Sequence, residues 1–317
     1  MNIAIWVGFI VFVALMLAID LGVLHKKASV IGTAEALRWT GLCICLALLF
    51  NVGVYFLYEH RWGGFEPHSA LSGKDAALQF LTAWLVEQSL SLDNVFVIAL
   101  IFSYFKIPRE LQHRVLFWGI LGALLMRGLM IALGAALISH LYWVHYLFGA
   151  LLIYAAVKIL SVEDSQIEPE KNLLFRLARR LFPVTPQLEG EKFVTRLNGK
   201  LALTPLFLVL LVVESTDVLF AIDSIPAVFA ITSDPFLVFT SNIFAILNLR
   251  SLYFALAALM DKFSQLKIGL VIILIFVGAK MLLIHHLTIP TEITFAVIVL
   301  ALGGSMALSL KKPVTRL

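Results

Sequence analysis

Two short motifs place acidic residues inside apolar stretches of the chain. The first is EQSLSLDNV at residues 87–95, and the second is DVLFAIDSI at residues 217–225. Each contains an acid, five intervening residues, an aspartate, a small polar residue and a β-branched residue. Carboxylate, amide and hydroxyl oxygens are the ligands that hard divalent cations such as Mg²⁺, Ca²⁺ and Mn²⁺ prefer. The candidate metal ligands are Glu87, Asp93, Asn94, Glu214, Asp217, Asp223 and Ser224.

The balance of charge inside the apolar stretches favours a bound cation. An ionisable side chain at the centre of a bilayer costs about 2.5–3.5 kcal/mol on insertion scales, so such residues usually have a function. Arg127 and Arg250 are the expected charge partners, yet two arginines cannot neutralise five acids. Lys158 and Lys280 lie close enough to the ends of their stretches to reach the interface, so we do not count them. Asp20 is a candidate accessory ligand.

Composition identifies the class of protein that must hold these residues. Of the 317 residues 61% are hydrophobic and only 14% are charged, about half of what a soluble domain carries. The net charge of +4 is explained by basic loops beside membrane helices. The expected partner is therefore the lipid bilayer, and no nucleic-acid partner is expected. Cys43 and Cys45 would point away from each other on a helix, which argues against a disulfide.

Nine apolar stretches have membrane-spanning length. They lie near residues 3–24, 36–58, 77–102, 114–138, 141–160, 201–222, 235–259, 266–284 and 292–310. Of the 24 Lys and Arg residues, 18 fall in one set of alternate loops and two, Arg61 and Lys74, in the other. The positive-inside rule makes the first set cytoplasmic, which predicts an external N-terminus and a cytoplasmic C-terminus.

The two motifs belong to a longer internal repeat. Residues 124–127, ending in Arg127, match 247–250, ending in Arg250, and residues 156–160 match 278–282. Repeat 1 covers about 77–160 and repeat 2 about 201–284, each with three stretches. Since three is odd, the second copy enters from the opposite side, as in many transporters whose sites lie where the halves meet. The predicted fold is a single all-α polytopic membrane domain of about nine transmembrane helices with an inverted three-helix repeat.

Local sequence predicts departures from simple helices. On an unbroken helix Asp93 lies about 120° from Glu87, so we expect convergence of the acids to require unwinding, for which Pro226 is the expected cause in the second copy. Between the repeats, the loop at about 161–200 contains a basic amphipathic segment at 173–182, suited to an anionic membrane surface. It is followed by an Asn198-Gly199 hairpin signal at 193–203.

The sequence resembles the TerC family, and its bacterial Alx branch most closely. The motifs at 87–97 and 214–227 and the stretch Ser-Asn-x-Phe-Ala-Ile-Leu-x-Leu-Arg at 241–250 carry this resemblance. It covers nearly the whole chain and implies kinship with LysE-type exporters, Mn²⁺ efflux across the bacterial cytoplasmic (inner) membrane, and an acidic site at the seven candidate ligands. The family names also refer to tellurium resistance and redox modulation.

Two classes of function remain open on this sequence. One is a divalent metal exporter that carries Mn²⁺ as substrate, with protons as a candidate exchanged ion and no cofactor. The other is a membrane-embedded regulatory, redox-modulating or scaffold protein linked to tellurite or pH stress, in which the charges hold helices together. No ATP-binding motif or nucleophilic triad occurs, so no enzymatic activity is expected. The oligomeric state cannot be derived from the sequence.

Overall fold

The computed structural model describes residues 3–22, 32–62, 65, 71–141, 143–161, 172–197, 199–256, 266–284, 286–287 and 289–311. Within these ranges the chain forms ten helices and one β-hairpin. The helices are α1 (Ile3–Gly22), α2 (Thr33–His60), α3 (Gly73–Tyr104), α4 (Arg109–His140), α5 (Val144–Ser161), α6 (Leu173–Leu181), α7 (Pro205–Phe229), α8 (Pro235–Leu256), α9 (Leu266–Leu282) and α10 (Thr291–Lys311), and the strands are β1 (Val194–Leu197) and β2 (Lys200–Leu203).

The structure confirms an all-helical membrane protein. Six of the described helices, α2, α3, α4, α7, α8 and α10, are long and apolar enough to cross a membrane, and α1 and α5 are shorter apolar helices. Nine of the ten helices coincide with the nine apolar stretches of the sequence. Large apolar side chains such as Leu125 and Leu300 are exposed on the outer surface, as expected of residues that face lipid.

Polar residues at the helix starts fix where several helices begin. The Ser72 hydroxyl accepts a hydrogen bond from the Asp75 backbone N–H at 3.1 Å, which caps α3. Asp234 does the same for α8, because its carboxylate accepts from the Phe236 N–H at 3.0 Å. Pro205 occupies the first turn of α7, where its missing N–H costs no helical hydrogen bond.

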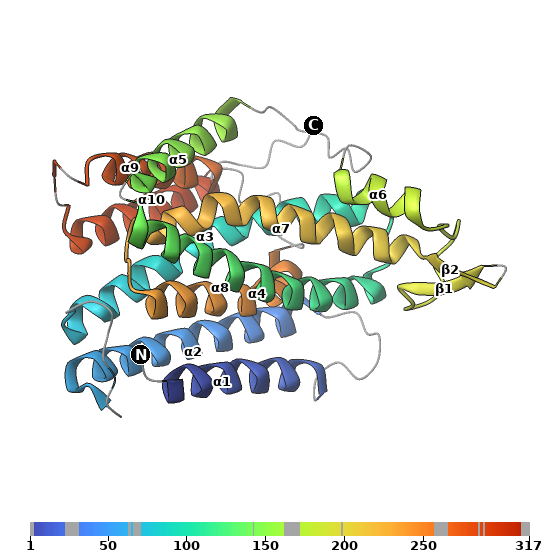
Figure 1. The fold of residues 1–317 in the computed structure, drawn as a ribbon, viewed down its shortest axis with the longest axis horizontal. Coiled ribbons are helices and arrows are strands. Elements are labelled where there is room, and N and C mark those ends of the chain that lie inside the picture. Colours follow the sequence, from blue (N-terminus) through green and yellow to red (C-terminus); the bar gives the residue numbers. More distant parts are fainter. Residues whose placement is uncertain are drawn as a thin grey trace.

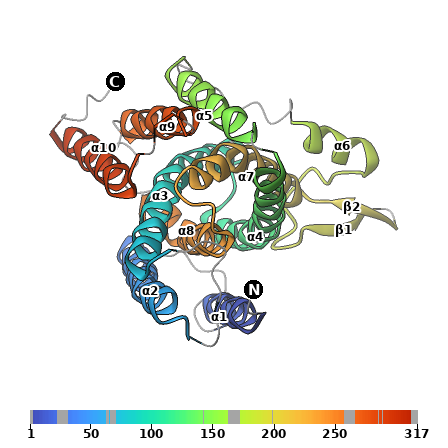
Figure 2. The ribbon, with the colours of Figure 1, turned by 60° about the vertical axis from the view of Figure 1, so that its left-hand side comes forward.

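Helices α3, α4, α7 and α8 form the centre of the molecule, with α1 and α2 on one side and α5, α9 and α10 on the other (Figure 1 and Figure 2). Helix α3 packs against α8, and α4 packs against α7. Helices α3 and α7 also contact each other, as do α4 and α8, and α5 and α9. If α3, α4 and α5 correspond to α7, α8 and α9, the α3–α8 contact corresponds to the α4–α7 contact. The other three contacts each join a helix to its own counterpart.

Aromatic side chains join the first two helices to this centre. The ring centroids of Phe9 and Phe50 lie 5.4 Å apart, and those of Phe50 and Phe244 lie 4.8 Å apart. Phe80 and Phe236 belong to the same buried cluster. This cluster joins α1 and α2 to α3 and α8, so the first two helices pack on the centre of the molecule rather than forming a separate body.

The segment between the repeats forms the amphipathic helix and the hairpin that its sequence predicts. Helix α6 buries Phe175 and Ala178, and its N-terminal Asn172 donates to the Ser215 hydroxyl of α7 at 2.5 Å. Strands β1 and β2 pair antiparallel with Leu197 opposite Lys200. Gly199 in the turn has a φ of 77°, a conformation that glycine adopts without strain. Helix α7 therefore starts at Pro205, later than the predicted 201, since 200–203 is a strand.

Candidate functional site

Arg127 of α4 is the centre of a buried charge network. Its side chain donates to Glu87 Oε2 of α3 at 2.7 Å through Nη1 and to Asp217 Oδ1 of α7 at 3.1 Å through Nη2. Arg127 is 1% exposed and Glu87 is 0% exposed. Glu87 and Asp217 are the first acids of the two repeated motifs, so one guanidinium joins corresponding positions of the two repeats. Arg127, one of the two expected charge partners, therefore forms ion pairs with two of the five acids.

The same guanidinium also reaches neutral side chains. Its Nη1 lies 3.1 Å from Asn242 Oδ1 of α8 and 3.4 Å from Ser224 Oγ of α7. The planar fork of arginine suits this arrangement, because it presents five N–H donors in fixed directions. Asn242 was not among the candidate residues, although it lies in the 241–250 stretch that carries the family resemblance. The network therefore ties α3, α4, α7 and α8 together at one depth.

A cavity of about 350 Å³ lies beside this network. Asp93 and Asn94 of α3 and Asp223 and Ser224 of α7 all line it. Asp93 corresponds to Asp223 in the repeated motifs, and Asn94 corresponds to Ser224. Asp93 and Asp223 are half-buried, whereas Asn94 and Ser224 are buried. The remaining lining residues come from α3, α5, α7 and α9: Leu90, Phe96, Val97, Ala155, Lys158, Ile159, Phe220, Lys267, Leu270 and Leu274.

The prediction that unwinding brings the acids together is wrong. Helix α3 is continuous through residues 87–95, and α7 is continuous from Pro205 to Phe229 with Pro226 in its last turn. The two acids of each motif are six positions apart, which turns the second about 120° from the first on an intact helix. The first acids face Arg127 and the second acids face the cavity. The packing of α3 against α7 brings the first acids together at Arg127, and the second acids line one cavity, without a break in either helix.

Two lysines line the cavity, although we did not count Lys158 as a partner of the acids and did not consider Lys267. Both side chains are exposed. Lys158 interacts electrostatically with Asp223, and Lys267 interacts electrostatically with Asp93. Lys158 is thus exposed near the end of α5, as expected, and it also lines the cavity. Lys280, its counterpart in the repeat, instead donates to the Thr294 hydroxyl of α10 at 3.0 Å.

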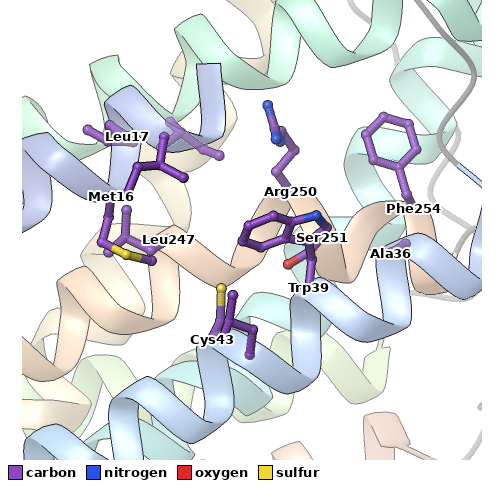
Figure 3. Close-up of a pocket in the computed structure, with 12 residues that line it drawn as sticks. Met16, Leu17, Ala36, Trp39, Cys43, Leu247, Arg250, Ser251 and Phe254 are labelled. Atoms are coloured by element: carbon purple, nitrogen blue, oxygen red, sulfur yellow. The ribbon is translucent and has the colours of Figure 1, made fainter. Parts of the chain in front are cut away.

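Two predicted site residues lie apart from the cavity. The Glu214 carboxylate rests against Gly122 of α4, in the space that a Cβ at that glycine would occupy. Arg250 is buried and lines a second cavity of about 130 Å³ between α1, α2, α4 and α8. Figure 3 shows Arg250 in this mostly apolar cavity with Leu17, Trp39, Cys43 and Phe254 around it. The side chain of Asp20 lies outside the described residues.

The seven candidate ligands therefore do not form one cluster. Within the described ranges, no three His, Cys, Asp or Glu side chains are placed so that they could hold a metal ion. Any ligand set in the cavity must combine the two aspartates with neutral oxygens. Asn94 Oδ1 suits that role, because it is buried and no described residue donates a hydrogen bond to it. A buried acceptor without a donor is costly unless a water or a cation satisfies it.

Comparison with known proteins now assigns the family. The model of the integral membrane protein TerC family matches residues 72–315, which include both repeats and the whole site. The chain belongs to the TerC family. This confirms the resemblance that the two motifs carry in the sequence.

Several known proteins are similar to this TerC-family chain over almost its whole length. An uncharacterized membrane protein of Myxococcus xanthus is 49% identical over 308 residues, which are 97% of this chain and 92% of the relative. A protein of Escherichia coli K12 named "Putative membrane-bound redox modulator Alx" is 43% identical over 295 residues, 93% of this chain and 90% of the relative. An uncharacterized membrane protein of Rickettsia felis is 40% identical over 97% of this chain and 98% of the relative. No solved structure matches the chain.

Proposed function

We propose that this TerC-family protein exports a hard divalent cation, foremost Mn²⁺, from the cytoplasm across the bacterial inner membrane. The observation that carries the proposal is the cavity in which Asp93 and Asp223, from corresponding positions of the two motifs, stand with Asn94 and Ser224. Carboxylate, amide and hydroxyl oxygens bind Mn²⁺ in preference to soft metals. The carried ion is the substrate, so no resident cofactor is required.

The arrangement of the helices supports the inverted repeat on which such an exporter would depend. The α3–α8 and α4–α7 contacts correspond to each other under the repeat, and α3–α7, α4–α8 and α5–α9 are contacts between equivalent helices. A pseudo-two-fold axis relating the two halves would produce this set of contacts. Arg127 bridges Glu87 and Asp217 at equivalent positions, close to where such an axis would pass. Transporters with inverted repeats bind substrate at this place.

The position of the two lysines gives the cavity a direction. Lys158 stands three residues before the end of α5, and Lys267 is the second residue of α9. A Cβ at Gly149, near the start of α5, would meet Gly278 and Leu282 near the end of α9, so the two helices run antiparallel. The two lysines therefore lie toward the membrane face where α5 ends and α9 begins. The positive-inside rule makes this face cytoplasmic, which suits an exporter that takes up its ion from the cytoplasm.

The Arg127 network favours a second candidate function, a regulatory or scaffold protein. Buried ion pairs can serve mainly to specify helix packing. The name of the Escherichia coli relative points to redox modulation, and the described cysteines that such a role would use are Cys43, which is half-buried, and Cys45, which is exposed. These two residues lie on α2, apart from the cavity that holds Asp93 and Asp223.

Cellular manganese separates the two candidates. Cells without the protein should accumulate Mn²⁺ and grow poorly in excess manganese, with little change toward copper. The wild-type chain should restore normal levels and Asp93→Asn should not. Asp75→Asn is the matched control, since it makes the same chemical change at another half-buried aspartate of α3, in the first turn and outside the cavity lining. Equal manganese content with and without the protein would favour the scaffold function.

A further inference from the structure

Helix α6 lies alongside the first half of α7 (Figure 1). Before its first residue, Asn172 donates to the Ser215 hydroxyl of α7 at 2.5 Å. Just after its end, the Pro183 carbonyl accepts from the Leu203 N–H at 2.9 Å, and Leu203 directly precedes the first residues of α7. Helix α6 therefore runs back along α7 from Ser215 towards the start of that helix, and hydrogen bonds hold it at both ends.

The contact at Ser215 places the start of α6 within the depth of the membrane. Helix α7 has 25 residues, which corresponds to about 37 Å, and the hydrocarbon core of a bilayer is about 30 Å thick. For α7 to cross this core, no more than about 7 Å of it can extend beyond either face. Ser215 follows Pro205 by ten residues, or about 15 Å, so it lies roughly 8 Å or more inside the core. The positive-inside rule makes this side the inner leaflet.

One side of α6 is buried and a second side exposes leucines. Phe175 and Ala178 are buried next to α7. Leu173, Leu177 and Leu181 are spaced four residues apart, so they form one stripe, and they are 70%, 48% and 63% exposed. On a helix this stripe is turned about 130° from the buried side. Such a stripe is costly to expose to water, but costs nothing among acyl chains.

Three arginines occupy the remaining side of α6. Arg176, Arg179 and Arg180 are all exposed, and the segment 172–182 contains no acidic residue. Among the ion pairs of the described residues, none involves these three arginines. Arg179 and Arg180 lie in the last turn, at the end of α6 that is nearest the start of α7 and so nearest the membrane surface. The guanidinium fork of arginine binds phosphate oxygens in pairs.

We propose that α6 is embedded in the inner leaflet, with its leucine stripe among the acyl chains and its arginines on the phosphates of anionic phospholipids. A cytoplasmic protein would have to enter the bilayer to cover leucines at this depth, whereas lipid is already there. The excess of positive charge matches anionic headgroups. The sequence pattern places this segment on the membrane surface, but the contact with Ser215 lies deeper. The inference goes beyond the proposed function and does not depend on it.

The first measurement locates the leucine stripe. Leu177→Cys, made in a Cys43→Ala/Cys45→Ala background, is labelled with the fluorophore NBD and reconstituted in phosphatidylglycerol-containing liposomes. Its emission should be quenched by lipids with nitroxide-labelled acyl chains and should resist aqueous iodide. Leu201→Cys is the matched control, because Leu201 is also an exposed leucine, at 53%, but lies on β2, which precedes α7. Iodide should quench that label and nitroxide lipid should not.

The second measurement tests lipid charge through the melting temperature of the purified full chain in detergent. Added phosphatidylglycerol should raise the midpoint by about 5 °C when the free lipid reaches about 100 times its Kd, and phosphatidylcholine should not. The rise should be lost in the variant Arg176→Gln/Arg179→Gln/Arg180→Gln. Glutamine keeps a helix propensity close to that of arginine, so this variant is expected to fold. The rise should be kept in a control that removes three exposed positive charges next to and within the hairpin, Lys192→Gln/Arg196→Gln/Lys200→Gln.

Each measurement can overturn the proposal. It fails if nitroxide lipid quenches the label at 177 no more than the label at 201, or if the label at 177 is shielded from both quenchers, as at a contact with another protein. It also fails if phosphatidylcholine stabilises the chain as much as phosphatidylglycerol does, or if the arginine variant keeps the full rise. Neither measurement involves Mn²⁺, so these results leave the proposed function untouched.

Discussion

Arg127→Met tests whether the buried network holds the helices together. The substitution keeps a long side chain but removes the charge that faces Glu87 at 2.7 Å and Asp217 at 3.1 Å. Glu87 is fully buried, so its carboxylate would be left without a counter-charge away from water. Breaking a buried ion pair by removing one partner costs about 3–5 kcal/mol.

The expected loss can be measured as a change in melting temperature. At about 2 °C per kcal/mol for a chain of this size, Arg127→Met should lower the unfolding midpoint in detergent by about 6–10 °C. Arg114→Met is the matched control, because Arg114 pairs with Glu191 at 2.6 Å but both side chains are partly exposed. Exposed pairs contribute about 0–1 kcal/mol, so this variant should shift the midpoint by about 2 °C at most.

A triple variant completes the test. Adding Glu87→Gln and Asp217→Asn to Arg127→Met removes the unpaired charges, and replacing a whole buried ion network by neutral groups is often close to neutral in stability. The triple variant should therefore recover most of the lost melting temperature. If Arg127→Met is no less stable than Arg114→Met, or if the triple variant is no more stable than the single one, the network does not have the stabilising role assigned to it.

Two further predictions concern packing and topology. Gly149→Val and Gly278→Val should each lower the unfolding free energy by about 1–3 kcal/mol, because a Cβ at either glycine meets the backbone oxygen of the other at 2.9–3.0 Å. Gly53→Val on α2 should not lower it, since an added Cβ there meets nothing within 4 Å. Equal melting temperatures for all three variants would contradict the close approach of α5 and α9. Reporter fusions after residue 185 and at the C-terminus should report cytoplasm and fusions near Phe65 the outside; an external signal at 185 would remove the inverted-repeat argument.

Local sequence determines much of this fold. The apolar stretches predict where the membrane helices lie, and the Asn198-Gly199 pair predicts the turn between β1 and β2. The amphipathic pattern at 173–182 predicts α6. These features depend on side chains close in sequence, so propensity and periodicity suffice. The starting residue of α7 is missed because a short strand of apolar residues resembles the beginning of a membrane helix.

The site depends on contacts that sequence spacing does not contain. Helical periodicity already separates Glu87 from Asp93 by about 120°, but it does not reveal that Arg127 faces the first acid while a cavity faces the second. That division follows from how α3, α4 and α7 cross. Lys267 reaches the cavity from a helix that starts more than 170 residues after Asp93 in the chain. Only the pairing of α5 with α9 brings it there.

The most direct test of the central claim is Mn²⁺ flux through purified protein in proteoliposomes. Normally folded Asp93→Asn and Asp223→Asn proteins should transport no Mn²⁺, because each loses a charge that would balance the ion while keeping the size of the side chain. Folding should be retained, since a neutral amide is cheaper to bury than a carboxylate. Asp75→Asn, in the first turn of α3 and outside the cavity lining, should transport at the wild-type rate. Wild-type flux in both cavity variants would contradict a shared cation site between the two repeats.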